Sequence, residues 1–438
     1  MFRRWRPLLA TAGLIVFEAA SSLWWGPAIV GARHWSLPED MWSTLVAAQR
    51  LMHGDLAGLY TPPTALVSFP GTALMLVPLV ALLAWSGIPL GPDWSTAAHP
   101  AAWLLTGPYE IALAAVPLFA ADYIAERRSV TARNRLLLAA AEAIALWGVT
   151  VRWGHPEDAL ATGLVLYAYQ ADSPVRKGWL VGAAVAVQPL VLLAVPVLMV
   201  DLPLRRFTGF LVRAALPAVV LLGAALAANP AATVRAVFHQ PNYPSVDHPT
   251  LWTSLAPRMA DGSVASGPGR LAAIALACLI AFWLRRRGTS DLLWWVAVAL
   301  ALRSVFEPVM VAYYLWPPMA VALIVAATRG RLAVTALATT TITMAAQVAW
   351  RSPWVWWVPL LIALAITLAL ARGTGTRRLA LHLRWCLLTT RPHVIHRLIN
   401  KVPRLTGRPT RRTDRTASPH NRCHTASSAR QCVCSIHI

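Results

Sequence analysis

The stretch TGFLVRAALPAVVLLGAALAA, residues 208–228, contains one charged side chain, Arg213. A run of about twenty predominantly apolar residues is the length of helix that crosses the hydrocarbon core of a bilayer. Runs of this kind recur along the chain, and a soluble protein with one large core would not be expected to repeat them. The sequence therefore predicts an all-α, polytopic integral membrane protein.

The composition agrees with this prediction. Of the 438 residues, 57% are hydrophobic and 13% are charged, and the mean hydropathy is +0.54. Soluble domains carry about 25% charged residues. We expect roughly 10–13 transmembrane helices in a domain that covers residues 1–371. The apolar runs lie at 8–31, 64–86, 103–125, 135–152, 157–171, 178–201, 208–228, 270–285, 290–306, 308–328, 331–349 and 353–371.

Basic residues indicate the orientation of the chain. Arg3, Arg4 and Arg6 precede the first apolar run, and residues 372–438 hold fourteen Lys or Arg and one acid. Because cytoplasmic segments are enriched in Lys and Arg, we expect a multi-pass plasma-membrane protein with both termini in the cytoplasm. Residues 372–438 contain too little apolar surface to fold alone, which predicts a basic, disordered cytoplasmic tail. Its charge favours retention beside anionic lipid over nucleic-acid binding.

One basic cluster conflicts with a topology in which every apolar run crosses once. Residues 126–135, with four arginines, would then face the outside. The conflict disappears if the proline-rich run 64–101 and the run 178–201 are re-entrant or broken elements, which membrane proteins tolerate where backbone lines a cavity. The turn at 153–158 then faces the outside together with the polar segment 32–63.

The outer segment 32–63 contains the first candidate residues. Pro38, Glu39 and Asp40 begin a predicted helix, which Gly54 ends. This helix would lie along the membrane surface on an apolar stripe formed by Leu45, Ala48, Leu51 and Met52. The two acids either cap the helix or carry chemistry.

A second group of candidates lies in the turn Arg152-Trp-Gly-His-Pro-Glu-Asp158. The turn places a cation, an imidazole and two carboxylates between two apolar runs. Charge near a membrane core is costly and tends to be functional. The alternative is a solvated turn in which Pro156 begins the next helix and the two acids cap it.

Further charged residues lie in or beside the apolar runs. Glu18 and Glu142 lie within runs, and Arg303 lies four residues before Glu307, so that these two could pair on one helix face. Arg303 could instead bind a lipid phosphate. The sequence contains no P-loop, no GxGxxG after a strand and no zinc-ligand spacing, so no metal-ligating residues are assigned.

The order of these features resembles the actinobacterial polyprenyl-phosphate-sugar-dependent mannosyl- and arabinosyltransferases, which are multispanning enzymes of the GT-C fold. The resemblance covers most of residues 1–330 and rests on Asp40, Gly54, Tyr60, Phe69-Pro70-Gly71, Pro78, the turn 154–158, Gly182, Gln188-Pro189, Pro196, the loop 248–255 and Tyr313-Tyr314-Leu-Trp-Pro317. The chain departs from that family at Gln188, where the family usually has lysine, and at Glu157 and Asp158, where it usually has an amide.

The resemblance implies a membrane glycosyltransferase at the outer face of the plasma membrane. It would move a sugar, in the first instance mannose, from a polyprenyl phosphate donor to a lipid-linked or envelope glycan acceptor. Asp40 would be the catalytic base, with Glu39 as the second choice. The donor phosphate and substrate would contact Arg152, His155, Glu157, Asp158, Gln188, Arg303, Tyr313 and Tyr314. No cofactor is indicated beyond a divalent cation held by the acids of the turn. The alternatives are a transporter or lipid-linked sugar flippase, and a non-catalytic relative of the GT-C enzymes.

Overall fold

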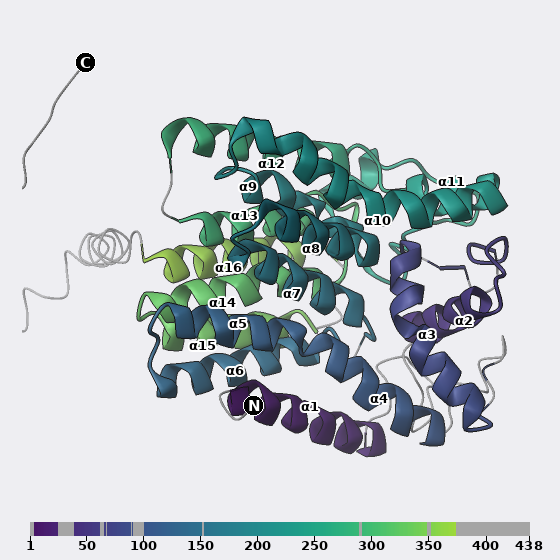
Figure 1. The fold of residues 1–438 in the computed structure, drawn as a ribbon, viewed down its shortest axis with the longest axis horizontal. Coiled ribbons are helices and arrows are strands. Elements are labelled where there is room, and N and C mark those ends of the chain that lie inside the picture. The colour runs from purple at the N-terminus through teal and green to yellow at the C-terminus, as the bar shows by residue number, and fades with distance from the viewer. Residues whose placement is uncertain are drawn as a thin grey trace, which may run out of the picture. The chain divides into compact units, whose positions relative to one another are not determined.

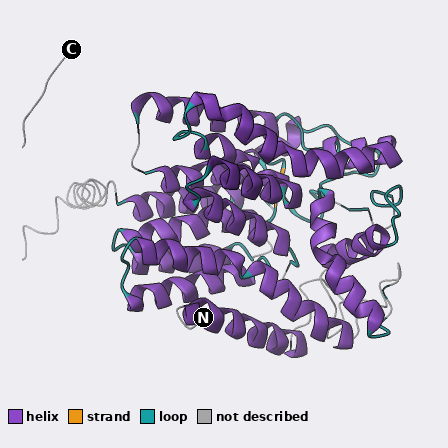
Figure 2. Cartoon of the chain, viewed as in Figure 1, coloured by secondary structure: helices purple, strands orange, loops and turns teal. Residues whose placement is uncertain are grey.

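The computed structural model describes residues 4–24, 39–61, 65–66, 68–88, 90, 100–150, 153–288, 291–347 and 352–373. This part of the chain is mostly helical, with a single pair of two-residue strands, which confirms the all-α prediction (Figure 2). Its elements are α1 (Trp5–Trp24), α2 (Glu39–Met52), α3 (Pro70–Trp85), α4 (Pro100–Ala114), α5 (Val116–Arg127), α6 (Ala132–Trp147), α7 (Pro156–Gln170), α8 (Pro174–Val187), the 3₁₀ helix η3 (Pro189–Ala194), α9 (Val195–Leu198), η4 (Leu204–Arg206), α10 (Phe207–Ala228), α11 (Pro230–Phe238), β1 (His248–Pro249), η5 (Leu251–Leu255), α12 (Gly269–Arg287), α13 (Leu292–Phe306), β2 (Val309–Met310), η6 (Ala312–Leu315), α14 (Trp316–Thr328), α15 (Leu332–Ala345) and α16 (Trp357–Arg372).

Each predicted apolar run overlaps at least one of these helices, which Figure 1 labels. Two described helical segments, Ala102–Arg127 and Leu204–Ala228, are long and apolar enough to cross a membrane, and six further apolar helices are shorter. The predicted tail lies outside the described residues from 374 onward. The run 308–328 becomes a helix only at Trp316, after a short strand and a 3₁₀ turn.

The run 178–201 is broken where the sequence predicts a break. Helix α8 ends at Val187, Gln188 is extended with φ −141° and ψ 103°, and a 3₁₀ helix begins at Pro189. Proline disfavours helical backbone in the residue before it and has no N–H of its own to donate. The α-helical hydrogen-bond pattern is therefore interrupted at Gln188 and resumes as a 3₁₀ helix.

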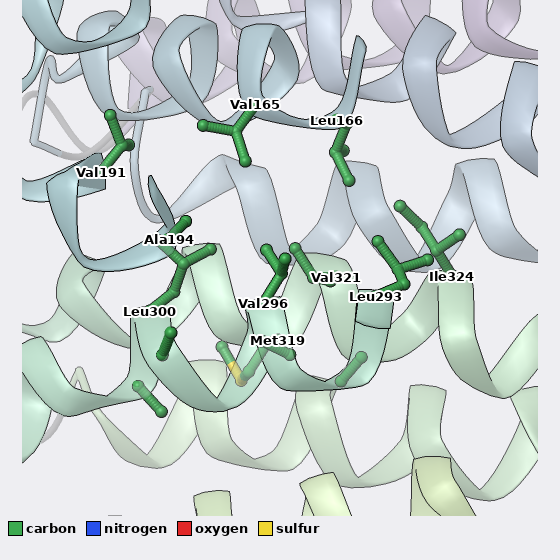
Figure 3. Close-up of a cluster of buried hydrophobic side chains, with 14 of the residues drawn as sticks. Val165, Leu166, Val191, Ala194, Leu293, Val296, Leu300, Met319, Val321 and Ile324 are labelled. Atoms are coloured by element: carbon green, nitrogen blue, oxygen red, sulfur yellow. The ribbon is translucent and has the colours of Figure 1, made fainter. Parts of the chain in front are cut away.

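The core of the bundle is built from interlocking aliphatic side chains of α7, η3, α13 and α14 (Figure 3). Helix α14 is apolar on every side, and each residue from Trp316 to Ala327 is buried. An all-round apolar helix is stable in the interior of a bundle. It contacts α5, α6, α7, α13, α15 and α16 and so connects the earlier and later parts of the sequence.

Helices α2 and α3 pack against each other beside this core (Figure 1). The predicted stripe of α2 is present, since Leu45 and Ala48 are fully buried and Leu51 and Met52 are partly buried. The stripe packs on a neighbouring helix in the structure. The helix ends before Gly54, whose φ of +76° favours glycine.

Ion pairs show which helix ends meet. Arg4 Nη1 lies 2.7 Å from Asp122 Oδ2, and Arg4 Nη2 lies 2.5 Å from Glu126 Oε2. Arg128 Nη2 donates to the hydroxyl of Tyr169 at 3.0 Å. The start of α1 and the ends of α5 and α7 therefore share one end of the bundle, and the cluster 126–135 lies beside the N-terminal arginine.

Candidate functional site

Three segments far apart in the sequence meet at the other end of α7. They are the first turn of α2, the turn that precedes α7, and the segment from the end of α13 through η6. They bring together seven of the predicted site residues, which are Asp40, His155, Glu157, Asp158, Arg303, Tyr313 and Tyr314. We call this group the acid–arginine cluster.

His155 lies between two carboxylates. Its Nε2 is 2.9 Å from Asp40 Oδ2, across 115 residues of sequence, and its Nδ1 is 2.5 Å from Glu157 Oε1. Both ring nitrogens can donate only when the imidazole is protonated. Burial alone would lower the pKa of His155, but the charge of Glu157 and the hydrogen bonds with Asp40 and Glu157 raise it well above its ordinary value. The site therefore favours an imidazolium that joins two carboxylates.

Asp40 is the solvent-accessible member of this trio. Its side chain is 44% exposed, whereas the side chains of His155 and Glu157 are each 7% exposed. Asp40 is the second residue of α2, and one of its oxygens is fixed by the imidazole. The oriented carboxylate of Asp40 is therefore accessible to a molecule that approaches from solvent.

The local sequence explains the turn before α7. Gly154 has a φ of +68°, and Pro156 provides the first helical residue. Glu157 and Asp158 then fall in the first turn, where the helix dipole favours negative charge. Both are nevertheless buried, at 5% and 2% exposure, and each contacts another charged side chain. A solvated turn with simple capping acids does not describe this geometry.

Arg303 and Asp158 form a buried ion pair. Arg303 Nη1 lies 2.9 Å from Asp158 Oδ1, with side-chain exposures of 7% and 2%. The guanidinium carbon lies 3.5 Å from the centroid of the Tyr314 ring, so the cation also faces an aromatic surface. Within the described part of the chain, Arg303 Nε and Asp158 Oδ2 are buried without a hydrogen-bond partner. The pair therefore keeps an unused donor and an unused acceptor.

Arg303 and Glu307, which could have paired on one helix face, pair with other residues in the structure. Helix α13 ends at Phe306, and Glu307 is extended because Pro308 follows it. The Glu307 carboxylate instead accepts from Arg270 Nε at 2.8 Å. The backbone carbonyl of Glu307 accepts from the Thr250 hydroxyl at 2.8 Å, beside the antiparallel pair β1 and β2. This contact joins the loop 248–255 to the end of α13.

Tyr313 forms an aromatic wall of the cluster. Its ring is stacked on His155, with 4.1 Å between centroids and 28° between planes. Tyr313 and Tyr314 meet edge to face at 4.9 Å. The two tyrosines thus contact both the histidine trio and the arginine pair.

Gln188 lies at the broken end of α8 and is buried. No hydrogen bond or ion pair among the described residues links its side chain to the acid–arginine cluster. The Phe69-Pro70-Gly71 motif lies beside this break, because a Cβ on Gly71 would fall 2.2 Å from the Ala186 carbonyl oxygen. Thr72 also donates to the carbonyl of Val187. Two motifs that are distant in the sequence therefore support each other.

Two other candidates lie outside the described residues. These are Arg152 and the side chain of Glu39, whose backbone begins α2. Within the part of the chain that the structure describes, no group of three or more His, Cys, Asp or Glu is arranged to hold a metal ion. Both nitrogens of His155 are already engaged with carboxylates.

Sequence reasoning missed Glu110. This residue of α4 is 1% exposed and lies within electrostatic reach of Glu18, Glu157 and His155. An acid inside the long apolar segment Ala102–Arg127 is the same signal that singled out Glu18 and Glu142, and it could have found this residue. Glu142 is buried on α6, and no described contact joins it to the cluster.

No protein-family model matches the chain, and no curated protein sequence matches it.

Proposed function

We propose that this chain is a polytopic membrane glycosyltransferase of the GT-C type. It transfers a sugar, in the first instance mannose, from a polyprenyl phosphate to a hydroxyl of a lipid-linked or envelope glycan at the outer face of the plasma membrane. The observation that carries the proposal is the acid–arginine cluster, in which an oriented, accessible carboxylate shares one site with a buried arginine that has an unused donor.

The chemistry of the transfer needs both parts of this cluster. Asp40 accepts the proton of the acceptor hydroxyl as its oxygen forms a bond to the anomeric carbon of the donor. The bond from that carbon to the phosphate oxygen breaks, and its electron pair leaves with the polyprenyl phosphate. Arg303 stabilises the charge that develops on this phosphate. The products are a glycoside and a polyprenyl phosphate, with the proton on Asp40.

The roles of the remaining residues follow from their contacts. His155 fixes the orientation of the Asp40 carboxylate, and Glu157 holds the imidazole from the other side. Asp158 positions Arg303. Tyr313 and Tyr314 provide aromatic surface of the kind on which sugar rings stack.

The membrane topology is part of the same proposal. Arginines gather at the helix ends that lie away from the cluster, including Arg4, Arg128 and Arg285. The positive-inside rule then assigns this end to the cytoplasm and the cluster to the outside. On α10, Val212, Val219 and Val220 are more than half exposed, which suits contact with lipid tails.

A transporter or flippase is the second candidate. The broken run at Gln188–Pro189 supports it, because transporters place interrupted helices and buried charges around a central site. Such a protein would move a lipid-linked sugar without breaking a bond to it.

The test is sugar transfer in membranes that contain the wild-type chain or the Asp40→Asn variant at equal expression. The donor is radiolabelled polyprenyl-phosphate mannose, and new glycolipids are counted. A general base contributes about 10²–10⁴-fold, so we expect product formation to fall at least about a hundredfold. Asp172→Asn, an exposed acid in the turn between α7 and α8, is the matched control and should keep full activity. Undiminished transfer by the Asp40 variant would refute its role, and no wild-type product would favour the transporter.

A further inference from the structure

A cavity of about 390 Å³ lies at the end of α7 that is remote from the acid–arginine cluster. Its polar lining is made by Arg4, Tyr123, Tyr167, Gln170 and Arg176. Helix α7 separates the two sites by its 15 residues, or about 20 Å at 1.5 Å per residue. The cavity is therefore a separate site from the one that we assign to transfer, and the inference below does not depend on that activity.

Helices α5 and α7 contribute to the cavity by the same spacing rule. Phe119 and Tyr123 are four residues apart on α5, and Tyr167 and Gln170 are three apart on α7. Side chains at these spacings lie on one helix face. Arg176 in the first turn of α8 and Arg4, which directly precedes α1, add the two cationic groups, and Ala171 and Leu180 also line the cavity. The donors thus project from secondary structure that is already packed.

The charges around the cavity leave a cationic group available. Arg4 is fixed by ion pairs with Asp122 and Glu126, and Arg135 pairs with the same two acids. Two guanidinium groups therefore neutralise the two carboxylates. Arg176 is exposed and forms no ion pair among the described residues, so no carboxylate there holds its guanidinium directly.

The lining defines the chemistry of a ligand. A guanidinium, two phenol hydroxyls and an amide can surround the oxygens of a phosphate, for which arginine is the preferred partner. Phe119 adds apolar surface that a bare inorganic ion would not use. The volume lies in the range of about 300–1,000 Å³ that is typical of cavities for small ligands. We propose that this cavity binds the phosphate group of an amphiphile, such as the headgroup of an anionic lipid.

The experiment uses the full chain purified in a zwitterionic detergent. Native mass spectrometry titrates phosphatidylglycerol and, separately, phosphatidylcholine, and thermal unfolding is followed with and without inorganic phosphate. We expect saturable binding of phosphatidylglycerol that Arg176→Ala weakens about tenfold, as loss of a charged hydrogen bond would. Tyr167→Phe keeps the ring and should weaken binding about fivefold.

Arg205→Ala is the matched control, because Arg205 is an exposed arginine of η4 that does not line the cavity. It should leave binding unchanged, and all variants should unfold as the wild type does without ligand. If inorganic phosphate stabilises the wild type but not Arg176→Ala, and the lipid does not bind, the ligand is a free phosphate and the site stands. Equal losses of phosphatidylglycerol affinity in Arg176→Ala and Arg205→Ala would overturn the proposal. So would the absence of binding of both phosphatidylglycerol and inorganic phosphate to the wild type.

Discussion

The buried pair of Arg303 and Asp158 gives the sharpest stability prediction. Replacing Asp158 by Asn leaves the guanidinium of Arg303 buried without its counter-charge, since the two side chains are 7% and 2% exposed. Breaking a buried pair in this way costs about 3–5 kcal/mol. Replacing both partners by apolar residues of similar size, Asp158→Leu with Arg303→Met, removes the charge as well, and such replacements are often neutral or stabilising. The double variant should therefore be more stable than the single variant by at least about 2 kcal/mol.

The assay is the free energy of unfolding of the purified chain, measured by titration with a denaturing detergent against a helical signal. The control is Glu126→Gln, which removes one partner of the ion pair with Arg4, where the side chains are 36% and 25% exposed. Partly exposed pairs contribute about 0–1 kcal/mol, so this change should have a small effect. A loss below about 1 kcal/mol for Asp158→Asn, or a double variant less stable than the single one, would refute the buried geometry.

Other expected outcomes concern neighbouring residues. The raised pKa of His155 means that the stability gained from its two carboxylate partners is fully present below its ordinary pKa of about 6.5 and is lost as pH rises through the higher folded value. His155→Gln should remove this pH dependence in unfolding measurements, and an unchanged profile would contradict the assignment. Gly71→Ala should destabilise the chain by about 1–3 kcal/mol, because its Cβ would meet the Ala186 carbonyl. Gly13→Ala in α1 meets nothing within 4 Å and should cost nothing; equal effects of the two changes on the unfolding free energy would show that the close contact is absent.

Much of the fold could be predicted because its signals are local. Apolar runs define the helices, Gln188–Pro189 favours a break, and Gly54 favours a helix end, as the structure has them. The separation of Arg303 from Glu307 also has a local signal. Pro308 disfavours helical backbone in the residue before it, which favours an end of the helix at Phe306. The signal is not decisive, because α3, α4 and α10 continue through Pro78, Pro108 and Pro217.

The assembly of the candidate site is not a local property. Asp40, His155 and Arg303 lie on segments whose approach depends on how α2, α7 and α13 pack, and spacing along the sequence does not encode that packing. These residues were candidates because a charged group beside an apolar run is costly. This criterion applies to each residue separately and says nothing about which residues meet. The same criterion would have added Glu110, which lies within electrostatic reach of Glu157 and His155, to the candidate residues.

Stability alone does not account for the acid–arginine cluster. Buried ion pairs can often be replaced by apolar side chains without loss of stability, because desolvation offsets their attraction. The chain nevertheless places Glu157 and Asp158 at consecutive positions of one helix turn and directs them to different cations. One acid holds the histidine that orients an accessible carboxylate, and the other holds an arginine with a donor still unused. Under the function that we propose, this single turn sets the relative positions of the proton acceptor and the anion-binding group, which a transfer between a hydroxyl and a phosphate-linked sugar requires.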